Sequence, residues 1–129
     1  MEKFFRIDTY YLKDGEGLFM DGNITEWDSS LKSLTDGTDM FYACSNLVSF
    51  NSDMDKLEIG KQMFFNCRAL ASFSGDLSSL SDGTDMFSTC ESLTDFDYNL
   101  TKIKHGNYMF AYCSKLASFS GDLSSLEEG

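Results

Sequence analysis

Four cysteines are the first residues of this sequence that could do chemistry, and they recur at a fixed interval as Cys44, Cys67, Cys90 and Cys113. Thiols can form disulfides or bind zinc. A disulfide requires a particular Cβ geometry, which cysteines repeated in register along stacked units do not naturally provide. A zinc site usually contains paired ligands at C-x₂₋₄-C spacing, and this sequence has no such pair. We therefore interpret the cysteines as buried, small apolar side chains and expect no cofactor.

An acidic or amide side chain also recurs, where the chain turns after Ser-Gly or its equivalent, as Asp53, Asp76, Asn99 and Asp122. A column of such oxygens could bind calcium, so these four residues are the metal candidates. The alternative is an Asx turn, in which the side chain accepts hydrogen bonds from nearby backbone N–H groups. We favour the turn, because Asp and Asn in turns are explained without a metal.

Residue types suited to catalysis are present but are not organised as a catalytic set. His105 is the single histidine and has no equivalent in the other repeats. A Ser or Cys nucleophile needs a base at hydrogen-bond distance, whereas the serines recur in interchangeable places, as on a solvated face. The carboxylates of Asp95 and Asp97 could do acid–base work, but nothing in the pattern places them in a cleft. We predict that the protein is not an enzyme.

All these residues belong to a repeat, G-x-x-M-F-x-x-C-x-x-L-x-x-F, which opens at Gly37, Gly60, Gly83 and Gly106, every 23 residues. About seven apolar positions per repeat is the density expected of a solenoid coil with a filled interior. We expect one repeat domain, 1–129, with these parts: an N-terminal strand or cap, 1–13; a degenerate repeat, 14–36; and four full repeats, 37–59, 60–82, 83–105 and 106–128.

The pattern predicts an α/β repeat solenoid that is richer in strand than in helix. Within a coil, G-x-x-M-F-x-x-C suits a single helical turn. The L-x-x-F and the later L-x-x-L predict two short extended segments, each paired in parallel one coil away. In the degenerate repeat, Leu18 takes the Phe place and Asp21 the Cys place. The aromatic and β-branched run Lys3–Leu12 reads as a strand that covers the open end of the stack or pairs with another chain.

The sequence Met86-Phe87-x-x-Cys90-x-x-Leu93-x-x-Phe96, present in four copies, resembles the signature of the bacterial-surface leucine-rich repeats of the BspA type. The resemblance covers residues 14–128 and implies a solenoid of leucine-rich-repeat type. Members of that family are similar to adhesins and surface-exposed binding proteins of bacteria, and related arrays occur in phage and in some protists. The family has no catalytic residues to carry over.

Composition excludes several classes of partner. With 10 basic and 21 acidic residues the net charge is -11, which argues against nucleic acid and against an anionic membrane surface. No run of 18 apolar residues occurs, so we expect no membrane insertion. Met1–Arg6 lacks the apolar segment of a signal peptide, and no anchor or cap follows Glu128. We expect the cell surface or secretion if the chain is part of a longer exported protein, and otherwise a phage particle or the cytoplasm.

The positions that vary between coils are the candidates for binding. Tyr42, Phe65 and Tyr112 put aromatic rings just before a cysteine, and Tyr98 and Tyr108 add rings elsewhere. We predict these five as partner-binding residues, because exposed aromatic side chains are the usual interface anchors. The alternative is that some rings fold over the stack and complete its packing.

The sequence supports two functions of different classes. The first is a non-catalytic binding or adhesion module that presents its repeat surface to a protein or glycan partner. The alternative is a structural component of a phage particle or a similar assembly. Self-association through the N-terminal strand or the open C-terminal coil would favour the second function.

Overall fold

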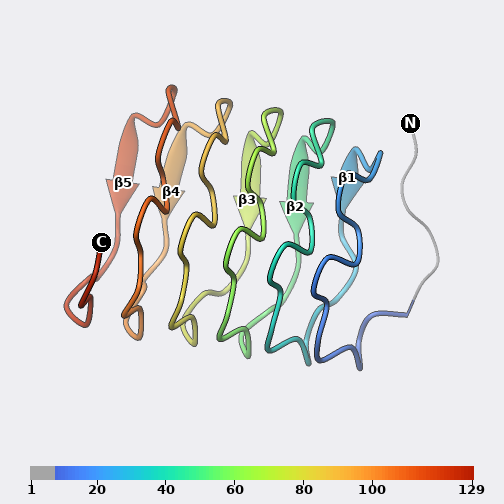
Figure 1. Cartoon of the computed structure of the whole chain (residues 1–129), viewed down its shortest axis with the longest axis horizontal. Coiled ribbons are helices and arrows are strands. Elements are labelled where there is room, and N and C mark those ends of the chain that lie inside the picture. The colour runs from blue at the N-terminus through green and yellow to red at the C-terminus, as the bar shows by residue number, and fades with distance from the viewer. Residues whose placement is uncertain (1–7) are drawn as a thin grey trace.

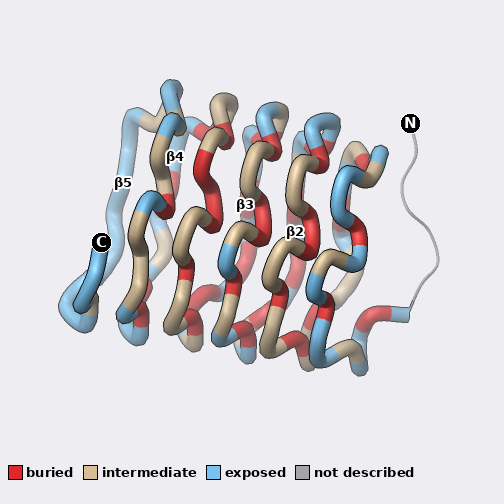
Figure 2. Tube along the Cα trace, in the orientation of Figure 1, coloured by how far each residue is buried: buried red, intermediate tan, exposed pale blue. Residues whose placement is uncertain are grey.

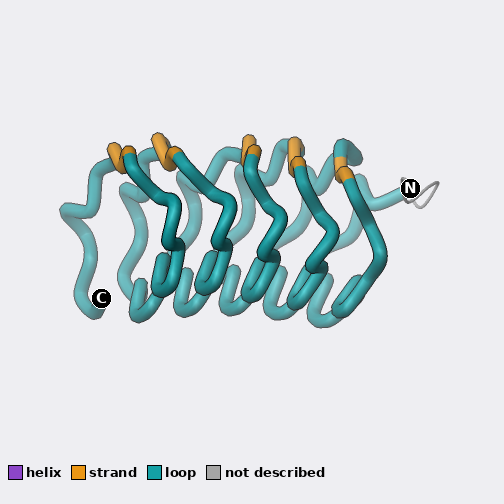
Figure 3. The backbone as a smooth tube through the Cα atoms, turned by 90° about the horizontal axis from the view of Figure 1, so that it is seen from above, coloured by secondary structure: helices purple, strands orange, loops and turns teal. Residues whose placement is uncertain are grey.

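The structure is a computed structural model that describes residues 8–129. The chain winds into coils that lie side by side, and each coil contributes one short strand to the same face (Figures 1 and 3). The strands are β1 (Glu26–Trp27), β2 (Ser49–Asn51), β3 (Ser72–Ser74), β4 (Asp95–Asp97) and β5 (Ser118–Ser120). They pair in parallel and in register, as a sheet β1-β2-β3 and a sheet β4-β5. The expected strand-rich parallel solenoid is therefore confirmed.

The expected helical turn is wrong, and residues 8–129 contain no helix. Consecutive β-turns form the G-x-x-M-F-x-x-C segment instead. Met40 N–H donates to Gly37 O at 3.0 Å within the turn, whereas Phe41 N–H donates to Met63 O of the next coil at 2.9 Å. Asp39, the third residue of the turn, has φ 58°, as in type II turns. A helical turn would direct every N–H along its own chain, so alternating turns are what allow these coils to bond to each other.

The second extended segment lies elsewhere than expected. The L-x-x-L pattern forms a turn, in which Leu57 N–H donates to Met54 O at 3.1 Å. The second parallel ladder comes two residues later in each coil, where single bridges join Asp14, Asp36, Ile59, Asp82, His105 and Glu128 in that order. Neighbouring coils are thus bonded along the β-turn segment and this bridge ladder, and on the strand face wherever their strands pair.

Buried residues recur at matching places in successive coils (Figure 2), and their aromatic rings stack into a column that forms the core. Phe41, Phe64 and Phe87 are fully buried, and adjacent rings stack at 5.5 Å and 5.4 Å. The rings of the strand phenylalanines pack edge-on against this column, as Phe50 does on Phe64 at 4.8 Å. Such pairs contribute about 0.5–1.5 kcal/mol each beyond the area they bury. The apolar columns of the sequence are therefore the core.

The Gly and the Met of the repeat are required together because they meet in neighbouring coils. A Cβ on Gly37 would lie 2.7 Å from Sδ of Met63, and a Cβ on Gly60 would lie 2.9 Å from Sδ of Met86. Both methionines are fully buried. Each methionine thus fills the space that a larger residue would need at the repeat glycine of the preceding coil.

The degenerate repeat has a different register from the one expected. Phe19 takes the Phe place, stacked on Phe41 at 5.6 Å, and Gly22 takes the Cys place, with its N–H bonded to Phe19 O at 2.9 Å. Leu18, assigned to the core from the sequence, is 49% exposed, and Asp21 is exposed too. The β-turn segment of this coil has the usual length, and the coil is one residue shorter just after it, between Gly22 and Ile24. Apolar spacing alone therefore gave the wrong alignment.

The N-terminal strand expected over Lys3–Leu12 falls partly on residues 1–7, which lie outside the described residues. In the rest of it, Leu12 N–H donates to Thr9 O at 3.1 Å and closes a turn over Tyr10 and Tyr11, so a strand is wrong there. The buried Thr9 donates its hydroxyl to Ser30 O at 2.6 Å. This bond and the packing of Leu12 on the core hold the segment against the first coil.

Candidate binding surface

The strand face is interrupted once, between β3 and β4. Among the strands that the structure describes, every other pair of neighbours is bonded in register. The bridge ladder continues without a break past the same two coils, through Ile59, Asp82 and His105. The interruption is therefore a local opening of the strand face, and the stack as a whole is continuous there.

Tyr98 occupies the interruption. Its equivalents in the other full repeats are the small residues Ser52, Gly75 and Gly121. The Tyr98 hydroxyl donates to Phe73 O at 2.8 Å, and its ring packs edge-on against Phe73 at 5.6 Å. A bulky ring in a column of small residues thus takes the space and one of the acceptors through which β3 and β4 would pair.

The spacing of the core rings reflects this opening. Phe73 and Phe96, which face each other across the interruption, have ring centroids 6.5 Å apart. The flanking pairs Phe50–Phe73 and Phe96–Phe119 are each separated by 5.5 Å. The gap between β3 and β4 is also wider than that between the other neighbouring strands (Figure 1), so the two central coils are spread apart on the strand face.

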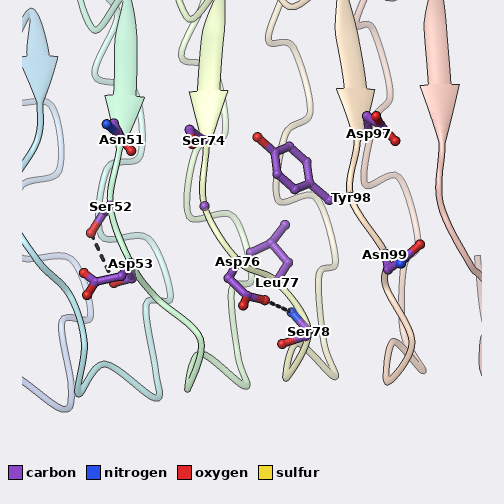
Figure 4. A pocket seen from close by; sticks show the side chains of 11 residues that line it. Asn51, Ser52, Asp53, Ser74, Asp76, Leu77, Ser78, Asp97, Tyr98 and Asn99 are labelled. Carbon is purple, nitrogen blue, oxygen red and sulfur yellow. Dashed lines mark hydrogen bonds between the residues drawn. The ribbon is translucent and has the colours of Figure 1, made fainter.

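A hollow of about 580 Å³ lies at this opening, beyond the ends of the strands (Figure 4). We call it the seam hollow. Three successive coils line it, almost entirely with polar side chains: Asn51, Ser52, Asp53, Ser74, Gly75, Asp76, Leu77, Ser78, Asp97, Tyr98 and Asn99. The Tyr98 ring projects from the β4 coil toward β3, at the edge of the hollow (Figure 4).

The expected Asx turn is present at Asp76 and Asp122, two of the four recurring Asp and Asn positions. Asp76 Oδ1 accepts the N–H of Ser78 at 2.9 Å, and hydrogen bonds from Ser78 lower the pKa of this carboxyl group. Asp122 makes the same bond to Ser124 at 2.9 Å, again with a lowered pKa. Asp53 differs, because its Oδ1 accepts the hydroxyl of Ser30 at 2.7 Å. Within residues 8–129, no group of three or more His, Cys, Asp or Glu side chains is placed to hold a metal ion.

The cysteines form a ladder that the sequence did not predict. Each thiol donates to a carbonyl of the preceding coil, as Cys67 Sγ does to Phe41 O at 3.1 Å and Cys90 Sγ to Phe64 O at 3.2 Å. All four cysteines are free, and three are buried while Cys113 is partly exposed. Burial raises the pKa of the Cys44 thiol to about 11. The interpretation as buried side chains holds for three of them, and each thiol is also a hydrogen-bond donor to the backbone.

The predicted partner-binding residues lie in more than one place. Tyr42 and Phe65 stack on each other at 5.0 Å, outside the core and half-buried. Tyr108 and Tyr112 are 72% and 79% exposed in the β-turn segment of the last coil. Tyr98 lies apart from these four, at the seam hollow. The structure therefore brings Tyr42 and Phe65 together but does not gather all five into one site.

Some residues of the seam hollow were missed by the sequence reasoning. Asn51 and Ser74 end their strands in exposed positions that vary between coils. The signal that could have found them is Tyr98, the single large residue in a column of small ones. Of the two carboxylates considered for acid–base work, only Asp97 lines the hollow, and Asp95 lies at the other end of β4.

The histidine does not lie at the seam hollow. His105 belongs to the bridge ladder, where its Nδ1 lies 2.9 Å from a carboxylate oxygen of Glu128. Both side chains are substantially exposed. This contact joins two successive coils as a surface pair, of a kind that contributes little to stability.

Comparison with protein families gave one result. Residues 15–128 match the description "BspA type Leucine rich repeat region", in six copies. Repeats of this type commonly serve as surface or protein-interaction modules. Comparisons with curated proteins and with solved structures returned no match. In the described part of the chain, no helix has the length and apolar character that crossing a membrane requires.

Proposed function

Because the chain belongs to the BspA-type leucine-rich repeat family, we propose that it is a non-catalytic binding module that presents its repeat surface to a protein or glycan partner. One observation carries the proposal. The pattern residues Met63, Phe64 and Cys67 are fully buried, whereas Tyr112, at a variable position just before a cysteine, is 79% exposed. Large exposed rings that the fold does not need are typical interface anchors.

The β-turn segments carry four of the five predicted partner-binding rings. The stacked pair of Tyr42 and Phe65 spans two adjacent coils, and Tyr108 and Tyr112 lie in the β-turn segment of the last coil. Tyrosine is suited to contacts with a partner, because it combines a large apolar ring with a hydroxyl and has few rotatable bonds to immobilise. The net charge of -11 also favours encounter with a basic partner over an acidic one.

The cysteines are not suited to nucleophilic chemistry. A thiolate is the reactive form of cysteine, and burial raises the pKa of the Cys44 and Cys90 thiols above the usual range. These thiols are therefore protonated at neutral pH, and they are occupied as donors to backbone carbonyls. Their role in the coil is structural, which supports a function in binding.

The test is a screen of the purified chain against immobilised arrays of proteins and glycans, followed by affinity measurements on the partners found. In the triple variant Tyr42→Ser, Phe65→Ser, Tyr112→Ser, we expect a protein partner to bind at least about tenfold more weakly, because hot-spot aromatics typically carry 2 kcal/mol or more. The matched control is Val48→Ser, which removes another exposed apolar side chain, 49% exposed. A partner that loses affinity equally in the control would contradict the proposal, as would the absence of any partner.

The alternative, a structural component of an assembly, is favoured by one feature of the last coil. Phe119 and Leu123 are 42% and 40% exposed there, although their equivalents in earlier coils are buried. A surface of this kind can bind a second copy. The molar mass of the purified chain, measured by light scattering, tests this. A monomer at every concentration would contradict the assembly function.

A further inference from the structure

We propose that the seam hollow binds a neutral saccharide unit. This inference rests on the proposed binding function and names a ligand class for one part of the surface. It depends on the feature that distinguishes this array from a regular one, the replacement of a small residue by Tyr98. The size, shape, charge and hydrogen-bonding groups of the hollow each restrict what it can bind.

The size of the hollow indicates a small ligand. A volume of about 580 Å³ falls within the range of small-molecule sites. A peptide that added a strand between β3 and β4 would need two interstrand spacings, about 9.6 Å. Tyr98 already occupies this gap, because its hydroxyl is bonded across the opening to Phe73 O and its ring packs edge-on against Phe73. An inserted strand therefore does not fit.

The charge of the hollow disfavours an anionic ligand. Its lining contains the carboxylates of Asp53, Asp76 and Asp97 and no Lys or Arg. Hydrogen bonds from Ser78 lower the pKa of Asp76 and so hold it ionised at neutral pH. Phosphate, sulfate or sialic acid groups would be repelled by these like charges.

A ligand with a positive charge is not required to satisfy these carboxylates. Asp53 and Asp76 already accept hydrogen bonds, from the Ser30 hydroxyl at 2.7 Å and from Ser78 N–H at 2.9 Å. Acceptor capacity is left over, because an ionised carboxylate has two oxygens with about four lone-pair sites. Groups that donate hydrogen bonds without carrying charge match this arrangement.

The remaining polar groups are suited to hydroxyl-rich molecules. Asn51 and Asn99 each present an amide that both donates and accepts, and Asp97 presents accepting oxygens. A sugar hydroxyl also both donates and accepts, so one hydroxyl can bridge a carboxylate and an amide. Because these side chains come from different coils, their spacing around the hollow can fix the orientation of a sugar ring.

Tyr98 supplies the apolar surface that a sugar ring also needs. The C–H groups on one face of a pyranose pack on an aromatic ring, while its hydroxyls point outward to polar groups. The Tyr98 ring lies in the gap between β3 and β4, with its face visible from the side of the hollow (Figure 4). The hydroxyl bond to Phe73 O and the edge-on contact with the Phe96 ring at 5.2 Å hold it in place. A ring fixed before binding loses little conformational entropy when a ligand arrives.

The test is a titration of the full chain with neutral oligosaccharides (maltotriose, cellotriose and chitotriose, with the strongest neutral binder of a glycan array added), followed by protein NMR. We expect saturable shifts at backbone amides of 51–53, 74–78 and 97–99. Sialyllactose and a diamine serve as charged probes and are expected to bind at least tenfold more weakly. Stronger binding of either charged probe at these amides would overturn the proposal, as would the lack of response to every neutral sugar.

The decisive variant is Tyr98→Gly, which installs the residue of the neighbouring coils. We expect the seam to close, amide exchange in β4 to slow, and sugar affinity to fall at least tenfold. Tyr11→Ser is the matched control, because it removes a tyrosine that is 76% exposed and lies in neither proposed binding surface, so sugar affinity should be unchanged. If Tyr98→Gly does not fold, the double variant Asp97→Ala, Asn99→Ala gives the same test at exposed positions. Sugar binding that persists in the folded variants contradicts this inference alone, whereas the binding function is tested separately through Tyr42, Phe65 and Tyr112.

Discussion

Two regions of this molecule have the same eleven residues, LASFSGDLSSL, and different surroundings. One copy is Leu70–Leu80, within the stack, and the other is Leu116–Leu126, in the last coil described. Both form a strand, β3 or β5, followed by the same Asx turn. Phe73 and Leu77 are 8% and 1% exposed, whereas Phe119 and Leu123 are 42% and 40% exposed. Identical sequence thus produces identical local structure, and the neighbouring coils decide how much of it is buried.

This difference shows that an inner coil contributes more to the stability of the solenoid than the last coil does. A coil cannot bury its apolar face alone, so its contribution depends on coils on both sides. The turn needs only the local sequence, because its hydrogen bond is short-range, and the strand needs a single neighbouring coil. The free energy gained from apolar burial is therefore unequal along the chain, even where the residues are the same.

Truncating the equivalent leucines should produce the largest contrast. Leu77→Ala removes a buried side chain, and we expect a loss of about 2–5 kcal/mol of unfolding free energy, as is typical for core leucines. Leu123→Ala removes a side chain that is 40% exposed, so we expect a loss of about 1 kcal/mol or less. Urea denaturation of both variants measures the difference. Equal losses would show that position in the stack does not control stability.

Adding one methyl group tests the same contrast at the glycines. In Gly60→Ala the new Cβ would lie 2.9 Å from the buried Sδ of Met86, whereas in Gly106→Ala its nearest neighbour is Cδ1 of Leu126 at 3.3 Å. We expect Gly60→Ala to cost about 1–3 kcal/mol through overpacking and Gly106→Ala to be close to neutral. The double variant Gly60→Ala, Met86→Ala should recover part of the loss, because it removes the clashing atom. Failure of this rescue would contradict the coupling of Gly and Met.

The cysteines allow the contrast between buried and exposed coils to be tested through the pH dependence of stability and of thiol labelling. The thiol pKa of Cys44 is raised from 9.0 to about 11 in the folded state. The unfolded chain therefore loses this proton first, so stability is intact below pH 9 and falls as the pH rises toward 11. Replacement of Cys44 by Ala should make the melting temperature less sensitive to pH across this window. Thiol labelling at pH 8 should modify the partly exposed Cys113 before the buried Cys90, and equal rates would contradict the burial difference.

The sequence was sufficient for those features that depend on a repeated pattern. The columns that contain Phe64, Cys67 and Phe73 are core, and the parallel register of the strands follows from the period. The conformation of G-x-x-M-F-x-x-C could not be obtained from local propensity. Its choice between a helix and β-turns depends on whether alternate N–H groups find acceptors in the next coil, which is a non-local property.

Two other features depended on single residues. The first coil is one residue shorter than the pattern, so Phe19 and not Leu18 enters the core. A deletion of one residue hardly alters apolar spacing, and either alignment was plausible from the sequence. The opening at Tyr98 had a visible signal, a large residue in a small column, but its consequence depends on how β3 and β4 accommodate the ring. The sequence had singled out Tyr98, Asp53, Asp76, Asp97 and Asn99 separately, but only the opening at Tyr98 brings them to one hollow.

The smallest expected contrast is at the Asx turns, and it separates local from non-local contributions. Asp76 and Asp122 make the same 2.9 Å bond to the backbone two residues later, and this bond needs no neighbouring coil. Asp76→Ala and Asp122→Ala should therefore lower the melting temperature by similarly small amounts, in contrast to the unequal leucine variants.

Both carboxyl groups have a lowered pKa, so their contribution is present at neutral pH and lost on acidification below about pH 4. Melting curves at pH 7 and pH 3 measure this. A much larger effect at Asp76 would mean that even these turns depend on the stack around them.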